Sequence, residues 1–297
     1  MYNEMWTERG CENVRTGLPK ISRGRLDPPV QDRRREVYRR LRRKLGKNKV
    51  LYRLLLPARK LMNIVFTGKL QAGKFIVCDD KKLVYLSNPK AACSSIKATL
   101  IPAIPEGKSA HQATRFLTRD YLTRDEKTYY KFTFVRNPFA RLVSCYEDRC
   151  IKEQRRVATG KRDAVYFNDY LFGYLRNVKS FDEFIRKIVR IPPFLHDMHF
   201  YPQYNLIYDR RGKCAVDFVG KLRKIDEQFP PIRERFGLLP LPHRNKTQKS
   251  DWRAFYTRET AELVRKKYER DISVFGYEDE YHRLIAYIDG KEAGENT

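Results

Sequence analysis

A lysine, small residues and two hydroxyl groups stand together in the segment Lys90-Ala91-Ala92-Cys93-Ser94-Ser95. Small side chains let a backbone approach an anion closely, while Lys90 adds a mobile positive charge and the serines add hydroxyl donors. Such a segment at the start of a helix is suited to holding a phosphate or sulfate group. It lacks both glycines of the Gly-x4-Gly-Lys-Ser/Thr loop of nucleotide triphosphatases. Taken alone, it is more typical of an ordinary strand-to-helix turn with an N-capping serine.

An arginine and a serine in a second segment, FVRNPFARLVSCY, change this interpretation. Arg136 stands at the carboxyl end of an apolar run, and Asn-Pro then forms a turn into a helix. Ser144 lies eight residues later, roughly two helical turns into that helix. Arg136 and Ser144 could therefore hold one phosphate while the Lys90 segment holds another.

The elements that must position these residues are strands followed by helices. The apolar runs 83–86, 132–135 and 215–220 are rich in β-branched and aromatic residues and predict strands, the first of them paired in a hairpin with 75–78. In an open α/β sheet, ligands lie beyond the carboxyl ends of the strands. The sequence therefore predicts an α/β fold with a mostly parallel central sheet flanked by helices, including an amphipathic helix over 257–275.

Together the two segments closely resemble the two cofactor motifs of carbohydrate sulfotransferases, in the branch that includes chondroitin/dermatan and heparan 2-O-sulfotransferases. The resemblance runs over residues 75–277. It implies a P-loop-like sulfotransferase fold and the sulfate donor 3′-phosphoadenosine 5′-phosphosulfate (PAPS), with no metal. It further implies that residues 90–95 bind the 5′-phosphosulfate, and that Arg136 and Ser144 bind the 3′-phosphate.

The resemblance also implies roles for several other side chains. Lys90 is expected to stabilise the leaving phosphate oxygen and the sulfuryl group. His111 is expected to be the base, because the family carries a histidine between the two motifs. His199 lies in an element resembling the family's Asp-x-His-aromatic-x-Pro sequence, and is expected to orient the acceptor or to be the second candidate for the base. Arg244 and Lys246 lie in a loop, 243–247, that closes over the nucleotide in relatives. For each histidine the alternative is a hydrogen-bonded structural role.

Lys and Arg exceed Asp and Glu by 62 − 36 = 26, which points to an anionic partner without identifying it. The polar, basic stretch 152–169 predicts an exposed insertion beside the site, where residues 152–162 favour an anionic carbohydrate acceptor, with a solvated surface loop as the alternative. A lipid-linked sugar would fit the basic, partly apolar N-terminal region. The six cysteines form no Cys-x2-Cys pair, which argues against a zinc site and suits a reducing compartment.

Two other classes of function make predictions that the sequence does not meet. A P-loop-like kinase predicts the glycine-containing loop that is missing here. A basic nucleic-acid-binding protein would fit the charge and the aromatic content, but the sequence has no RNA-recognition octamer, zinc pattern or helix-turn-helix. The prediction is therefore an enzyme that binds no nucleic acid.

The chain is expected to comprise an irregular segment (1–29), a basic helical region (30–70), a sulfotransferase domain (71–290) and a tail (291–297). No signal peptide is visible, and charged residues and Pro57 interrupt the most apolar stretch, 50–66. Animal Golgi members of the family carry a membrane anchor. The sequence therefore predicts a bacterial-type cytoplasmic enzyme. Its basic region is either a solvated helix or a helix that attaches to an anionic membrane, as a peripheral contact, or to an anionic glycan.

Overall fold

A computed structural model describes residues 74–120, 122–160, 166–209, 211–242 and 251–295. The expected segments 1–29 and 30–70 lie outside these residues, and the division of the chain into domains stays a prediction. The strands are β1 (Lys74–Cys78), β2 (Leu83–Ser87), β3 (Thr118–Arg119), β4 (Tyr130–Val135) and β5 (Phe218–Lys221). The α-helices are α4 (Cys93–Thr99), α5 (Ala110–Ala113), α6 (Pro138–Tyr146), α7 (Lys152–Ala158), α8 (Phe181–Arg190), α9 (Gln203–Ile207), α10 (Ile225–Phe236), α11 (Arg258–Lys267), α12 (Glu269–Phe275) and α13 (Glu278–Glu295).

The five strands form one sheet in the order β3-β1-β2-β4-β5. The predicted α/β fold is confirmed, and its core strands β2, β4 and β5 run parallel. The sheet is mixed, because β1 pairs antiparallel with both β2 and β3. The β1–β2 pair is the hairpin expected from the sequence.

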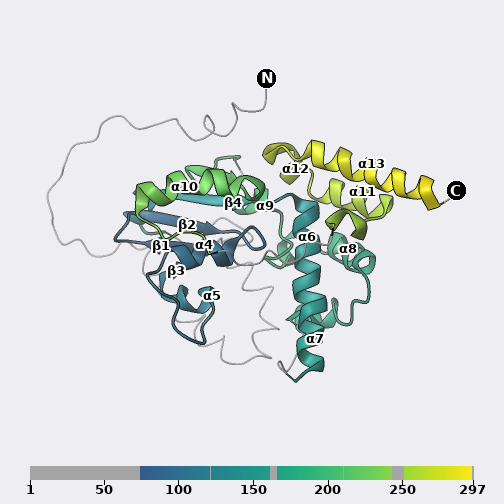
Figure 1. The fold of residues 1–297 in the computed structure, drawn as a ribbon, viewed down its shortest axis with the longest axis horizontal. Coiled ribbons are helices and arrows are strands. Elements are labelled where there is room, and N and C mark those ends of the chain that lie inside the picture. Colours follow the sequence, from purple (N-terminus) through teal and green to yellow (C-terminus); the bar gives the residue numbers. More distant parts are fainter. Residues whose placement is uncertain (1–73, 121, 161–165, 210, 243–250, 296–297) are drawn as a thin grey trace.

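One face of the sheet is covered by two helices, which Figure 1 shows lying over the strands. Ile96 of α4 and Phe229 of α10 pack in one cluster with Tyr85, Phe132 and Phe134. This cluster also explains a glycine in β5. A Cβ on Gly220 would stand 2.3 Å from the ring of Phe134, so a larger residue would push the two strands apart.

The second half of the molecule is helical and lies beyond the carboxyl ends of β2 and β4 (Figure 1). Its core joins α6, α8, α11, α12 and α13, and it includes Leu86 and Val135 from the carboxyl ends of β2 and β4. The expected helix 257–275 is two helices, α11 and α12, with Tyr268 between them. The sheet therefore ends against the helical core, and residues that follow β2 and β4 lie between the two halves.

A long helical segment runs from α6 into α7 through a π-helical turn, η3 (Glu147–Ile151). The beginning of the stretch 152–169, predicted to be an exposed insertion, is thus the helix α7, on which Lys152, Arg155 and Arg156 are exposed. Shorter 3₁₀ turns elsewhere are η1 (Arg115–Leu117), η2 (Glu126–Thr128), η4 (Tyr166–Gly173), η5 (Pro193–Leu195), η6 (Leu222–Lys224) and η7 (Trp252–Phe255).

Candidate active site

The turn between β2 and α4 has an unusual backbone. Lys90 and Ala92 both have left-handed conformations, with φ of 69° and 57°. Residues with a Cβ adopt this region at a cost of about 1–2 kcal/mol each. The N-cap of α4 is Ala92, which makes no side-chain cap. The alternative of an ordinary turn with an N-capping serine is therefore wrong, and the structure around the turn must hold it in place.

Buried polar side chains hold the two turns together. Asn88 donates to the carbonyl of Phe134 and to the amide oxygen of Gln203, both at 2.9 Å. Gln203, fully buried on α9, accepts from the backbone N–H of Arg136 at 3.0 Å and donates to its carbonyl at 2.7 Å. Asp271 in turn accepts from Gln203. The carboxyl ends of β2 and β4 are thereby fixed relative to each other.

Arg136 faces the Lys90 turn. Its guanidinium donates to the carbonyl oxygen of Lys90 at 3.2 Å. Burial, together with the nearby charge of Arg141, lowers the pKa of Arg136 to about 10, so it stays a cation at neutral pH. Arg136 and Lys90 are two cations in a partly buried place, which favours the binding of an anion. Ser144 lies half-buried on α6, and its side chain makes no polar contact with another residue of the described ranges.

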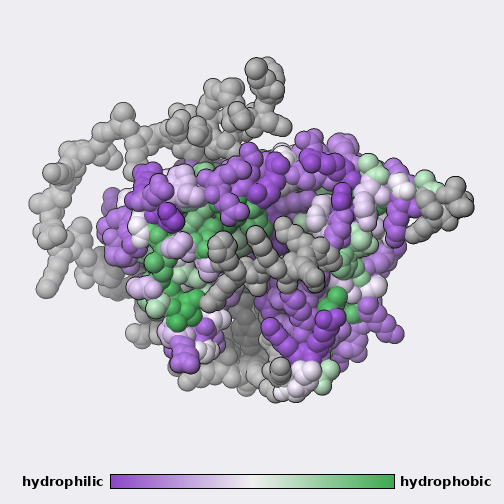
Figure 2. Space-filling view, in the orientation of Figure 1, coloured by the Kyte–Doolittle hydropathy of each residue, from purple (hydrophilic) through white to green (hydrophobic). Residues whose placement is uncertain are grey.

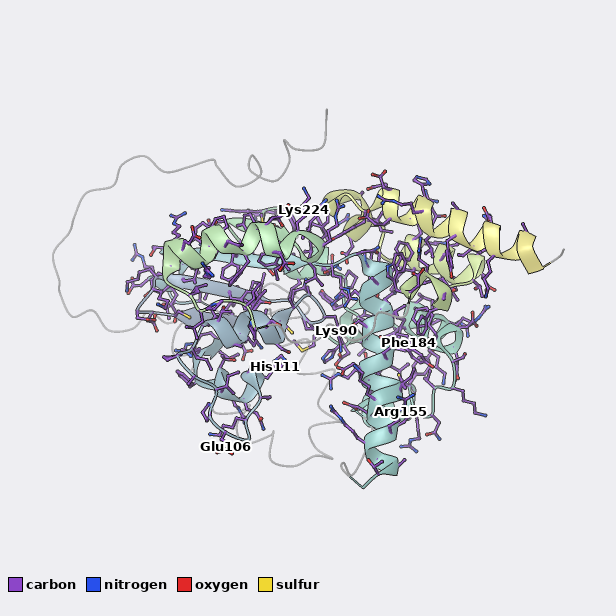
Figure 3. The ribbon with its side chains drawn as sticks, in the orientation of Figure 1. Lys90, Glu106, His111, Arg155, Phe184 and Lys224 are labelled. Atoms are coloured by element: carbon purple, nitrogen blue, oxygen red, sulfur yellow. The ribbon has the colours of Figure 1, made fainter. Side chains whose placement is uncertain are left out.

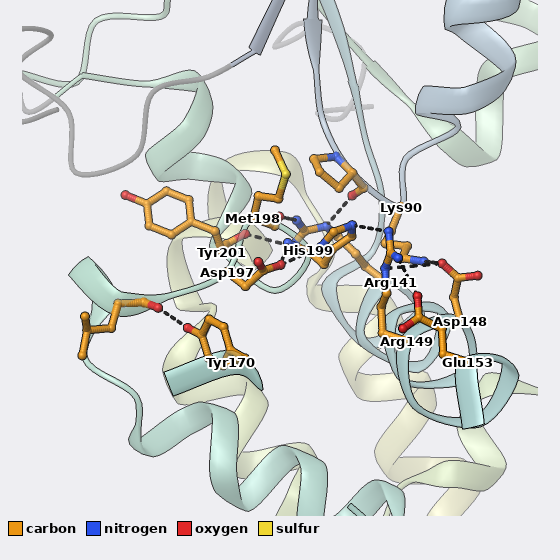
Figure 4. A network of polar contacts seen from close by, with 12 residues as sticks. Lys90, Arg141, Asp148, Arg149, Glu153, Tyr170, Asp197, Met198, His199 and Tyr201 are labelled. Carbon is orange, nitrogen blue, oxygen red and sulfur yellow. Dashed lines mark hydrogen bonds and ion pairs between the residues drawn. The ribbon is translucent and has the colours of Figure 1, made fainter. Parts of the chain in front are cut away.

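Arg141 holds the Lys90 turn in place from the buried side. Its side chain is 1% exposed and donates to the carbonyls of Pro89 at 3.0 Å, Tyr201 at 2.9 Å and Met198 at 3.1 Å (Figure 4). It therefore ties the Lys90 turn to the segment that contains His199. This role has no local signal in the sequence, because the three carbonyls lie more than fifty residues away from Arg141 in the chain.

His111 lies below α4 at the junction of the two halves, and Lys90 lies between the sheet and α6 (Figure 3). The Nε2 atom of His111 is 2.8 Å from the Ser94 hydroxyl, and Nδ1 is 3.1 Å from the ammonium of Lys97. A charged lysine can only donate, so Nδ1 accepts in this arrangement and Nε2 carries the proton toward Ser94. The predicted base therefore touches the predicted phosphate-binding segment.

His199 is buried in a different setting. Its Nδ1 is 2.6 Å from Asp197, and its Nε2 is 2.9 Å from the guanidinium of Arg149 (Figure 4). Because Arg149 can only donate, Nε2 accepts and Nδ1–H is held by the carboxylate. Burial lowers the pKa of His199 and outweighs the opposing effect of Asp197. The neutral imidazole is thus fixed in one tautomer.

Asp148 and Arg149, on η3, complete the site. Asp148 accepts from the Lys90 ammonium at 2.5 Å, and Arg149 also pairs with Glu153 at 2.8 Å. Partial burial raises the pKa of Asp148, but the charge and hydrogen bond of Lys90 outweigh it, so the pKa lies below its usual value. These partners have no signal in the sequence beyond the charged run after the second motif.

The structure thus brings together Lys90, residues 91–95, Arg136 and His111, and connects Lys90 to His199 through Asp148 and Arg149. Arg244 and Lys246 lie outside the described residues. Among the residues that the structure describes, no group of three His, Cys, Asp or Glu side chains could hold a metal ion. Within the same ranges, every helix is too short or too polar to span a bilayer.

Comparison with known proteins gives one family. Residues 73–278 match the Sulfotransferase family. Carbohydrate sulfotransferase 14 of Danio rerio is 30% identical over 239 residues, which are 68% of this chain and 61% of the relative. Carbohydrate sulfotransferase 11 of Mus musculus is 26% identical, over 55% of this chain and 53% of the relative. Carbohydrate sulfotransferase 12 of Xenopus laevis is 23% identical, over 68% and 59%.

The chain thus spans about half to three-fifths of the length of these relatives. No solved structure matches it. The matched family region contains both the Lys90 and the Arg136 turns, and His111 and His199 with them.

Proposed function

The chain belongs to the sulfotransferase family, and we propose that it transfers the sulfuryl group of PAPS to a hydroxyl of a carbohydrate. The contact between the Arg136 guanidinium and the Lys90 carbonyl is the observation that carries this proposal, since it joins two cation-bearing turns at one edge of the sheet. A donor with phosphates at both ends of an adenosine needs two such turns. The carbohydrate acceptor is supported by the names of the three relatives.

The small side chains and the charges of the two turns support this donor. The small side chains of Ala91 and Ala92 leave backbone within reach of the 5′-phosphosulfate, with Lys90, Cys93, Ser94 and Ser95 beside it. Arg136 and Ser144 would hold the 3′-phosphate, because a guanidinium offers two parallel donors to one phosphate. The resemblance to the family also assigns Arg244 and Lys246 to donor binding.

In the proposed reaction the acceptor oxygen attacks sulfur while the bond from sulfur to the phosphate oxygen breaks. The electron pair of that bond goes to the phosphate, and the acceptor proton goes to a base. Such a transfer depends on positioning and on neutralising the oxygens. Lys90 would neutralise the sulfuryl and leaving oxygens. The products are a sulfate ester and 3′-phosphoadenosine 5′-phosphate.

His111 is our choice of base because it touches Ser94 of the donor-binding segment. To accept a proton at Nε2 it must carry its own proton at Nδ1, which requires Lys97 to move away from Nδ1. His199 already has its proton held at Nδ1 by Asp197, and it is the second candidate. Its Nε2 is occupied by Arg149, which supports a role in orienting the acceptor side.

The acceptor is proposed to be anionic or lipid-linked. Figure 2 shows hydrophilic residues over α7, where Lys152, Arg155 and Arg156 are exposed. Contact of the basic region 30–70 with an anionic membrane is a separate proposal that rests on sequence charge, and flotation with anionic vesicles tests it. The cytoplasmic location stays a prediction.

Binding of the product nucleotide is the first test. We expect the full chain to be retained on immobilised 3′-phosphoadenosine 5′-phosphate and to be released by the free nucleotide. Release by DNA would favour a nucleic-acid-binding protein, and release by ATP with Mg²⁺ would favour a kinase. A screen of carbohydrate acceptors with labelled PAPS then tests transfer itself.

A further inference from the structure

The π-helical turn η3 carries two neighbouring side chains that serve opposite sides of the site. Asp148 accepts a hydrogen bond from Lys90 in the Lys90 turn, and Arg149 donates one to His199 in the segment Asp197–Tyr201 (Figure 4). π-helical turns are short irregularities that often occur at functional sites. Here the irregularity sends one charged side chain to each segment, and Arg141 on α6 of the same long helix contacts the backbone of both.

Lys90 is a flexible side chain that the structure nevertheless fixes. Its side chain is 11% exposed, and its ammonium lies 2.5 Å from the carboxylate of Asp148. A free lysine loses substantial rotamer freedom when it is confined to one position. Because Asp148 confines Lys90 before the donor arrives, that ordering does not have to occur during the reaction.

The same carboxylate has an opposite effect on donor binding. Asp148 is an anion close to the place where the donor's sulfate and phosphate are proposed to bind, so it weakens their attraction to Lys90. Arg149 offsets this charge only in part, because its Nε lies 3.7 Å from the Asp148 carboxylate while its charge is shared with the buried Glu153, which it meets at 2.8 Å. At this place Asp148 lowers the affinity of the site for the donor while it improves the positioning of Lys90.

We propose that Asp148 is a positioning residue for Lys90, and that it raises turnover at the expense of donor affinity. The proposal rests on the proposed function, because it takes Lys90 as the group that meets the sulfuryl oxygens. Arg149 extends the same support to His199 and fixes the π-helical turn from its other side.

Asp148→Asn tests this, because it keeps the shape of the side chain and removes its charge. We expect kcat to fall by about 10- to 100-fold. The Kd of 3′-phosphoadenosine 5′-phosphate, measured by calorimetry, should stay unchanged or fall by up to about tenfold. Damage to the fold would weaken binding and turnover together. Asp226→Asn, which removes one exposed carboxylate on α10, is the control and should match the wild type.

A wild-type kcat in Asp148→Asn overturns the proposal, as does a lower kcat accompanied by weaker nucleotide binding. If the Asn variant does not fold, Asp148→Glu decides: the displaced carboxylate should lower kcat by at least about threefold with unchanged Kd, and a wild-type kcat would contradict the role. Failure of the proposed function looks different, because the wild-type chain itself would then neither bind the nucleotide nor transfer sulfate.

Discussion

The guanidinium of Arg136 lies 3.2 Å from the carbonyl oxygen of Lys90. The two residues are 46 positions apart in the chain. Arg136 directly follows β4, and Lys90 lies in the turn after β2, which runs parallel to β4. This contact means that the two motifs lie side by side and form a single site. A molecule bound by both must bridge the ends of β2 and β4.

Arg136→Lys should weaken donor binding more than it slows the reaction. Lysine keeps the charge but cannot form two parallel bonds to a phosphate or keep the bond to the Lys90 carbonyl. We expect a donor KM raised about tenfold or more, with a smaller change in kcat. Titration of 3′-phosphoadenosine 5′-phosphate measures the affinity, and Arg190→Lys, at an exposed position on α8, is the control. Unchanged affinity would remove Arg136 from the donor site.

Substitution of the histidines separates the two candidates for the base. At saturating PAPS, His111→Ala should lower kcat by roughly 10²–10⁴-fold while nucleotide affinity is kept. His199→Ala should act mainly on the KM of the acceptor. Should His111→Ala retain near-full turnover and His199→Ala lose it, the base is His199 and the Asp197 pair is its orienting group.

Stability should depend on pH through His199. Its pKa is lowered in the folded protein from an unfolded value of 6.5. Above about pH 6.5 the residue is neutral in both states, and below it the unfolded chain binds a proton that the folded chain binds less readily. The wild type should therefore lose stability relative to His199→Gln as pH falls below about 6.5, by at most about 1.4 kcal/mol per pH unit.

Denaturant unfolding of both proteins between about pH 5 and 8 measures this difference. The matched control is His282→Gln, which removes a histidine from an exposed position on α13. A difference between wild type and His199→Gln that stays constant across this range would show that burial does not disfavour the charged imidazole.

Gly220→Ala should destabilise the sheet. The new Cβ would meet the Phe134 ring at 2.3 Å, and overpacking of this kind costs about 1–3 kcal/mol. Thermal unfolding should show a Tm lower by several degrees. Gly290→Ala on α13 is the control, because its Cβ meets nothing within 4 Å and alanine favours a helix. The double variant with Phe134→Leu should recover part of the loss, and no recovery would place the strain elsewhere.

Local sequence was enough to predict the two turns, because each has its own signal. The predicted strands 83–86 and 132–135 correspond to β2 and β4, and the histidine at 111 does lie beside Ser94. The mixed character of the sheet was less visible. The two-residue strand β3 is too short to show an apolar pattern.

The partners of the site residues could not be predicted in this way. The orientation of Asp148 and Arg149 follows from a π-helical turn, which changes the phase of the helix without a periodic pattern of its own. Arg141 looks like any arginine on a helix, and its burial depends on carbonyls from two distant segments. Contacts of this kind are set by tertiary packing, and a single sequence carries no local record of them.

Gln203 has a consequence for any attempt to recombine this protein with a relative. Its amide bonds to both strand ends and to Asp271, and both side chains are fully buried. A chimera with a crossover between positions 203 and 271 would separate the two partners. It would leave either the buried amide of Gln203 or the buried carboxylate of Asp271, whose pKa burial already raises, without its hydrogen-bond partner. Viable exchanges of the C-terminal helices should therefore transfer these two residues as a pair.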